Sequence, residues 1–199
     1  MYFLRGKVEG IYMHKVETLH CQNCGSQIAV TDKRCEYCGS IVTITSTMDF
    51  AHVDKFEAGK YLSLVNNDSK TLGFCYLKLG QYQKAKDCLL IALDSNVNDS
   101  LVFFAIAIAT LGNKKPFLHA RESIEEIERY LQSAITLESL GIYYFFFSYL
   151  RFDYHKRKFF DIAPNCNDLL IEAQTLGFSK DEVEAIFECL ELDLPSYYK

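Results

Sequence analysis

The chain has 199 residues, of which 49% are apolar, and a formal net charge of −5. This apolar content excludes global disorder, and the mild acidity argues against a protein that coats nucleic acid or anionic membranes. The sequence shows no apolar run long enough for a secretory signal or a membrane span, so we expect a cytoplasmic location. There, cysteines serve as thiols or metal ligands.

Eight cysteines divide the chain into two parts. Four fall between positions 21 and 38, and the other four are scattered singly. Residues 1–47 carry five Lys and Arg against four Asp and Glu, while residues 48–199 carry sixteen against twenty-two. β-branched runs at 27–31 and 40–45 predict strands in the first part, and periodic segments predict helices in the second. We therefore predict a mainly α protein with two domains, a β-rich module over 1–47 and an α-helical domain over 48–199.

The clustered cysteines form two Cys-x-x-Cys-Gly sequences, and the predicted metal ligands are Cys21, Cys24, Cys35 and Cys38. Each pair places two thiolates on one tight turn, and the glycine permits a backbone that turns its amides toward the sulfurs. Four thiolates close a tetrahedral site, which is typical of one structural Zn²⁺. Four thiolates also suit iron, so an iron–sulfur or rubredoxin-like site stays open as an alternative, although the spacing favours zinc.

This pattern resembles the zinc-ribbon family over residues 18–45. The resemblance implies a small β module organised by its metal. A closed four-thiolate site cannot hold an activated water, which argues against metal-assisted hydrolysis. With a net charge of only +1, the module also carries too little positive charge to favour binding to nucleic acid. We expect it to serve in packing or docking.

Residues 69–93 resemble one repeat of the tetratricopeptide (TPR) family. The matching positions are Leu72, Gly73, Tyr76, Gly80, Tyr82, Ala85, Leu89 and Ala92. In such a repeat, small residues let two antiparallel helices approach closely and large ones fill the seam between repeats. Two positions depart from the motif, because Ser69 stands where Trp is usual and Val97 where Pro is usual.

Later segments match the repeat more loosely, with an insertion whose loop contains Lys114, Lys115 and Pro116. A Ser-x-x-Glu capping box at 179–182 predicts the start of the last helix. We predict helices over 49–65, 101–112, 121–138, 139–153, 166–176 and from Ser179 to about Leu192. Together with the first repeat they form a TPR-like antiparallel array of seven or eight helices.

The family resemblance implies that the first helix of each repeat lines a concave partner-binding groove. The residues at those positions are Lys70, Phe74, Leu77, Lys78, Phe104, Ile108 and Leu111. This groove is mostly apolar. It would receive an apolar segment of another protein or peptide, or it would be covered by the ribbon, the last helix or a second copy of the chain.

A non-catalytic adaptor or scaffold that binds another protein is therefore the function we expect. The alternative hypothesis is a nucleic-acid- or transcription-associated factor using the ribbon or the basic cluster at 151–158, where cations lie beside aromatic residues. Such a cluster is also typical of a solvated helix end. A third hypothesis, an enzyme using Glu125, Glu126 or His155, has no catalytic motif to support it.

Overall fold

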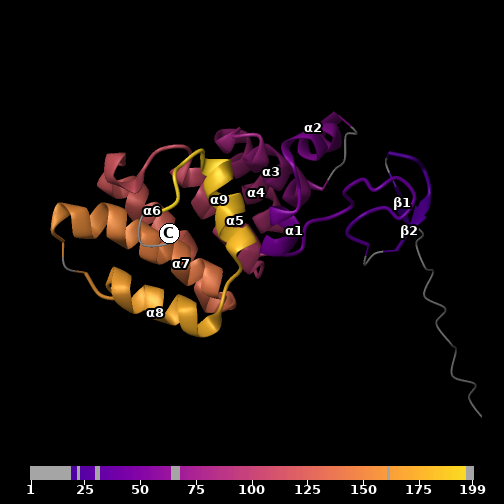
Figure 1. The fold of residues 1–199 in the computed structure, drawn as a ribbon. Helices are drawn as coiled ribbons and strands as arrows, with labels where there is room; N and C mark the ends of the chain where they lie inside the picture. The colour runs from indigo at the N-terminus through magenta and orange to yellow at the C-terminus, as the bar shows by residue number, and fades with distance from the viewer. Residues whose placement is uncertain (1–18, 22, 30–31, 64–67, 161, 196–199) are drawn as a thin grey trace, which may run out of the picture.

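The computed structural model describes residues 19–21, 23–29, 32–63, 68–160 and 162–195. In this part of the chain, a small β module lies at one end of a helical body (Figure 1). The described residues are mainly helical, as the sequence predicts. None of the described helices combines the length and the apolar character that crossing a bilayer requires.

The β module contains one short hairpin. Strand β1 (Leu19–His20) pairs with β2 (Gln27–Ile28) in antiparallel register, with His20 opposite Gln27. The strand predicted over 40–45 is wrong, because the structure forms only a single bridge there, between Arg34 and Ile41. Beyond this bridge the chain turns into the first helix, and the Thr45 amide donates to the Asp49 carboxylate over 3.1 Å. The last two residues of the strand predicted over 27–31 lie outside the described residues.

Nine α-helices follow in the described residues: α1 (Thr47–Ala51), α2 (Lys55–Ser63), α3 (Ser69–Lys78), α4 (Tyr82–Ser95), α5 (Ser100–Leu111), α6 (Arg121–Leu137), α7 (Gly141–Leu150), α8 (Cys166–Leu176) and α9 (Lys180–Leu190). A 3₁₀ turn, η1 (Pro116–Leu118), occupies part of the predicted insertion loop. A π-helical turn, η2 (Arg151–His155), extends α7, and a 3₁₀ turn, η3 (Lys156–Lys158), follows it.

The single helix predicted over 49–65 is wrong, because α1 and α2 are separate. His52 ends α1, and its backbone amide donates to the Met48 and Phe50 carbonyls. Asp54 then begins α2, because its carboxylate accepts the Glu57 amide over 2.7 Å. Aspartate competes for nearby backbone amides and so favours a new helix start over continuation. By contrast, the capping box predicted at 179–182 is confirmed, with both reciprocal hydrogen bonds present.

Consecutive helices pack as pairs: α3 with α4, α5 with α6, and α7 with α8. Only three residues connect α3 to α4, so these two helices run antiparallel. They approach closely at Gly73, where an added Cβ atom would lie 2.6 Å from Cγ of the fully buried Leu89. This contact has the packing role that the repeat motif predicts for a glycine at this position.

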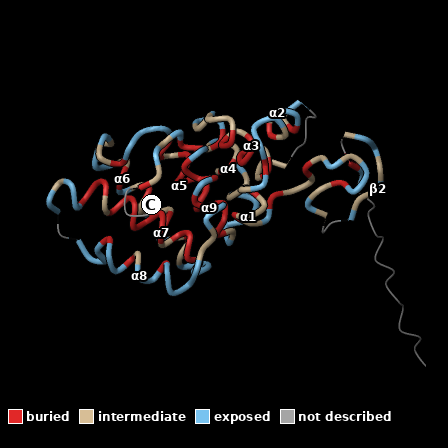
Figure 2. Tube along the Cα trace, viewed as in Figure 1, coloured by how far each residue is buried: buried red, intermediate tan, exposed pale blue. Residues whose placement is uncertain are grey.

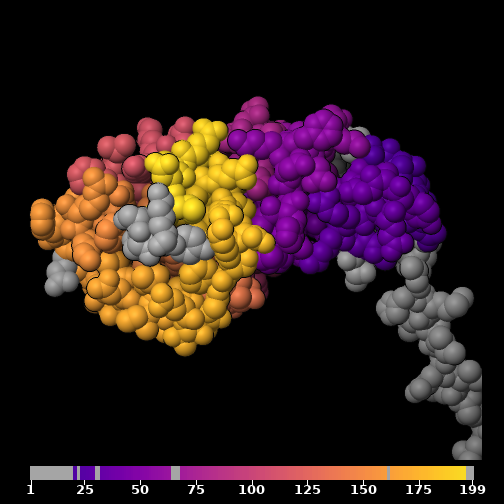
Figure 3. Space-filling view, viewed as in Figure 1, coloured from indigo at the N-terminus to yellow at the C-terminus, as the bar shows by residue number. Residues whose placement is uncertain are grey.

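Buried residues concentrate in α5, α7 and α9 (Figure 2). Phe104 of α5 packs against Tyr143 and Phe146 of α7, with ring centroids 4.5 and 5.6 Å apart. Next to Phe146 on α7, the Tyr149 ring lies 4.9 Å from the ring of Phe187 in α9. The chain thus returns its last helix onto the middle of the array, where α9 lies at the surface of one face (Figure 3).

Candidate metal centre

The two Cys-x-x-Cys-Gly turns have the same local geometry. The Gly25 amide donates to the Cys21 carbonyl and the Gly39 amide to the Cys35 carbonyl, each over 2.8 Å. Both glycines have positive φ, +74° and +70°, a conformation that a side chain disfavours. The residues that flank the two turns also match. His20, which precedes Cys21, pairs with Gln27, and Arg34, which precedes Cys35, pairs with Ile41. Two equivalent turns therefore face each other.

The four cysteine sulfurs lie close enough together to bind one metal ion, all within 4.8 Å of one another. Sγ of Cys21 lies 3.6 Å from Sγ of Cys38, and Sγ of Cys24 lies 3.7 Å from Sγ of Cys35. A tetrahedral ion with bonds of about 2.3 Å to sulfur sets its sulfurs about 3.8 Å apart. The sulfur spacing matches that geometry, and each turn supplies two of the four ligands.

Two serines that the sequence predictions did not include contact these sulfurs. Ser26 Oγ lies 3.0 Å from Sγ of Cys24 and 3.1 Å from Sγ of Cys35, so it joins the two turns. Ser40 Oγ lies 3.3 Å from Sγ of Cys38. The sequence could have indicated these two serines, because a serine directly follows the glycine in both Cys-x-x-Cys-Gly sequences. Hydrogen bonds between these hydroxyls and the sulfurs help to orient the ligands.

The thiols differ in their ease of ionisation. The hydrogen bond with Ser40 is the main cause that lowers the pKa of Cys38 to about 5, so its thiolate is present at neutral pH. The contact with Ser26 likewise lowers the pKa of Cys35. Burial raises the pKa of Cys21 to about 11. Because thiolate is the metal-binding form, a bound cation must displace the Cys21 proton, and binding releases that proton at neutral pH.

Ion pairs attach the β module to the first helices. Arg34 makes two hydrogen bonds with the Glu57 carboxylate, at 2.6 and 3.0 Å, and a third to the His52 carbonyl at 3.0 Å. Lys33 donates to Asp49 over 2.8 Å. Although burial of Asp49 opposes ionisation, hydrogen bonds from Lys33, Thr45 and Ser46 lower its pKa to about 2. These contacts span the predicted domain boundary.

Replacing Arg34 with methionine is expected to loosen this attachment. Both partners are partly exposed, so water screens the pair and the expected loss is about 1 kcal/mol. We expect faster cleavage of the connecting segment 42–46 by a protease of broad specificity. Arg121→Met is the matched control, because the Arg121–Glu125 pair lies on one helix with Arg121 79% exposed. Equal cleavage rates for wild type and Arg34→Met would contradict the prediction.

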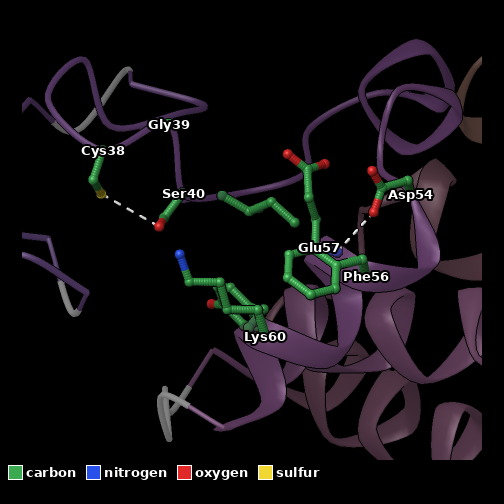
Figure 4. Close-up of a pocket in the computed structure, with 9 residues that line it drawn as sticks. Cys38, Gly39, Ser40, Asp54, Phe56, Glu57 and Lys60 are labelled. Atoms are coloured by element: carbon green, nitrogen blue, oxygen red, sulfur yellow. Dashed lines mark hydrogen bonds between the residues drawn. The ribbon is translucent and has the colours of Figure 1, made fainter.

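A cavity of about 280 Å³ lies between the second turn and α2. Its lining includes Ser40 and Ile41 from the module and Phe56 and Lys60 from α2. Figure 4 shows the Lys60 side chain extending from α2 toward Ser40. Phe56 is 80% exposed, and Tyr37, which precedes the cavity residues in the chain, is 77% exposed. This junction therefore combines a hollow with solvent-exposed aromatic side chains.

The residues of the predicted groove lie mostly in the core. The buried members are Phe74, Leu77, Lys78, Phe104, Ile108 and Leu111, each at most 3% exposed. Lys70 is half-buried and pairs with Asp99 over 2.6 Å. Of the two possibilities that the sequence left open, a groove open to a partner or a groove covered by other segments, the burial of these six side chains agrees with the second.

Helices α1, α7 and α9 cover these positions. The Phe50 ring of α1 lies 5.3 Å from that of Phe74 and 4.9 Å from the Lys78 ammonium. At α9, the Glu188 carboxylate lies 4.0 Å from the Lys78 ammonium, and beside this contact the Tyr82 hydroxyl donates to the Cys189 carbonyl over 2.7 Å. Covering by the last helix was one of the outcomes that the sequence left open. The physical reason is that an apolar face of this size is stable when buried.

The basic cluster at 151–158 does not form one surface. Arg151 is 5% exposed and His155 is buried, whereas Lys156 is exposed. Arg157 pairs with Asp153 over 2.7 Å, and the Lys158 ammonium lies 3.8 Å from the centroid of the Tyr154 ring. The cluster is therefore divided between buried residues, such as Arg151 and His155, and residues exposed to solvent, such as Lys156.

The acidic residues of the enzyme hypothesis lie in separate ion pairs. Glu125 pairs with Arg121 over 2.7 Å and Glu126 with Lys86 over 2.9 Å, while His155 contacts Glu128. Cys75 is fully buried in α3, and burial raises the pKa of its thiol to about 12, which keeps it in the neutral form. Glu125 and His155 nevertheless line one cavity of about 190 Å³ together with Arg121 and Glu128, whereas Glu126 and Cys75 are not among its lining residues. No protein-family model, curated protein or solved structure matches this chain.

Proposed function

We propose that the four cysteines hold one structural Zn²⁺ in a zinc ribbon. Support comes from the donor set, since four thiolates with sulfur spacings of 3.6 and 3.7 Å suit a tetrahedral soft ion. Cys21, Cys24, Cys35 and Cys38 would be its ligands. The ion would supply cohesion to the module rather than an activated water, because four protein ligands leave no open position.

We further propose that the chain is a non-catalytic adaptor, in which the ribbon and a TPR-like array bind another protein. The observation that carries this proposal is the packing of Gly73 against Leu89 within paired helices. It reproduces the close approach on which stacked helical hairpins depend. Scaffolds of this architecture commonly work through their surfaces, although fold alone does not establish function.

The partner surface in this proposal is the junction of the ribbon and α2. The predicted groove is filled by the chain itself, whereas Phe56 and Tyr37 expose large aromatic surfaces beside the junction cavity. Aromatic side chains contribute a large share of binding energy at protein interfaces. Glu57 and Lys60 add charged groups at the rim, which suits a protein segment with both apolar and polar side chains.

The test is quantitative affinity capture with purified, zinc-loaded chain from an extract of the source cells. We expect a protein that wild type enriches to fall at least about tenfold with Phe56→Ser, the typical effect of losing an interface aromatic. Ile91→Ser is the control, because Ile91 is 56% exposed on α4, outside the junction. Light scattering on the same samples detects self-association. Absence of both a partner and self-association, or equal losses with the two variants, would contradict the proposal.

A further inference from the structure

A second cavity, of about 180 Å³, lies between the turns η2 and η3 and the beginning of α8. Arg151, His155 and Lys156 line one side, and Asn165 and Asn167 line the other. The described residues that line it include cations and amides but no carboxylate. Its volume is below the roughly 300–1,000 Å³ of pockets for drug-sized ligands, so it suits a small molecule.

Arg151 is the unusual member of this site. Its side chain is 5% exposed, and within the described residues neither Nε nor Nη1 makes a hydrogen bond. The nearest carboxylate is that of Glu128, whose Oε1 lies 3.2 Å from Nε but also 2.8 Å from Nε2 of His155. The Glu128 carboxylate is therefore shared between Arg151 and His155. A guanidinium has five N–H donors, and burial without acceptors is costly.

The local backbone directs these groups into the cavity. A π-helical turn presents Arg151 and His155, and such turns are often found at functional sites. Opposite them, α8 begins with the capping box of Asn165 and Asp168. Asn165 Oδ1 accepts the Asn167 and Asp168 amides, which leaves its NH₂ group as a donor. The positive end of the helix dipole adds to this side of the cavity.

Among the described residues, four carboxylates near the site are already engaged. Glu125, which lines a neighbouring cavity that Arg151 and His155 also line, pairs with Arg121 over 2.7 Å. The Glu128 carboxylate contacts His155 and Arg151 from α6, on the inner side of the turn. The Asp168 carboxylate accepts the Asn165 amide over 3.3 Å. Asp153 accepts from Arg157 and from the Phe117 amide. Among the described residues, Arg151 and Lys156 are the Arg and Lys side chains that line the cavity, beside His155.

We infer that this cavity binds a small phosphate-bearing molecule, with Arg151 and Lys156 contacting the phosphate and the two asparagine amides completing its hydrogen bonds. A phosphate oxygen supplies the acceptor that the buried guanidinium lacks. Phosphate also accepts from several directions, which matches donors held on two separate elements. This inference goes beyond the adaptor function and does not depend on the junction surface.

The experiment is an NMR titration of zinc-loaded, ¹⁵N-labelled full chain with inorganic phosphate, at ionic strength held constant with chloride. We expect saturable shifts of the Asn165 and Asn167 side-chain amides at millimolar phosphate. Lys156→Met should weaken the affinity about tenfold, as expected for a lost hydrogen bond to a charged group. Lys115→Met is the matched control, since this exposed lysine lies outside the cavity lining, and it should leave the affinity unchanged.

Acetate serves as the second probe, because a carboxylate satisfies some of the same donors. Tighter binding of acetate than of phosphate would overturn the assignment of a phosphate ligand. The inference also fails if phosphate produces no saturable shifts, or if Lys156→Met and Lys115→Met weaken binding equally. Asn167→Asp, at an exposed position, is a further variant that should reduce phosphate affinity by charge repulsion without altering the core.

Discussion

Replacing Cys38 with serine is expected to lower the metal content from the proposed one ion per chain to almost none and to unfold the β module, while the helices remain folded. Among the described residues of the β module, the buried apolar side chains are those of Cys21, Cys35, Ile41 and Ile44, which form too small a core to stabilise the fold without a further contribution. In such modules metal binding is coupled to folding, and its free energy supplies the stability of the fold.

The affinity loss should exceed the roughly 10–100-fold that follows removal of a group that only orients a ligand. Metal analysis gives the stoichiometry, and hydrogen exchange of the Cys21 and Gly25 amides reports on the folding of the β module, since both amides are hydrogen-bonded in the structure. Cys88→Ser is the control, because this half-buried cysteine belongs to α4. Unchanged metal content in Cys38→Ser, or loss of the helical circular dichroism signal, would refute the prediction.

A second large effect is expected from Gly141→Ala at the beginning of α7. A Cβ atom there would lie 2.1 Å from the carbonyl oxygen of Gly177 and 2.8 Å from that of Ala173. Both contacts are with backbone, so relief requires α7 and α8 to separate. We expect a loss of about 3 kcal/mol in the free energy of unfolding, at the upper end of typical overpacking costs.

Thermal and urea unfolding followed by circular dichroism measure this loss, which corresponds to a decrease of roughly 6–12 °C in Tm for a domain of this size. Gly59→Ala is the matched control. Gly59 is within α2, and nothing lies within 4 Å of its added Cβ atom. That substitution should stabilise the helix by up to about 1 kcal/mol. A Tm for Gly141→Ala equal to that of wild type would show that α7 and α8 are not in close contact.

Local patterns predicted much of the fold. The capping box at Ser179 and Glu182 and the helix over 166–176 agree with the structure, because hydrogen bonds within a few residues determine helix ends. The prediction of one helix over 49–65 failed at Asp54, where a side-chain hydrogen bond begins a second helix. Periodicity alone does not distinguish a continuous helix from two helices that share an apolar face.

The candidate metal site was the part of the molecule that could be predicted most fully from the sequence. Its four ligands belong to two tight turns, so spacing largely determines where the sulfurs lie, and the structure brings all four within 4.8 Å. Their serine partners, Ser26 and Ser40, were overlooked although they repeat at the same place in both turns. The contact of Arg34 with Glu57 was not predictable, since it joins two elements through tertiary packing.

By itself, then, the sequence determined that four cysteines form one cluster and that the rest of the chain is helical, because both depend on short-range spacing and periodicity. Only the tertiary structure decided that α9 covers the predicted groove, with Glu188 beside Lys78, and that Arg151 lies buried beside a cavity. These outcomes depend on contacts between residues distant along the chain. The helical pattern identifies an apolar face, but the packing of the whole chain determines what buries it.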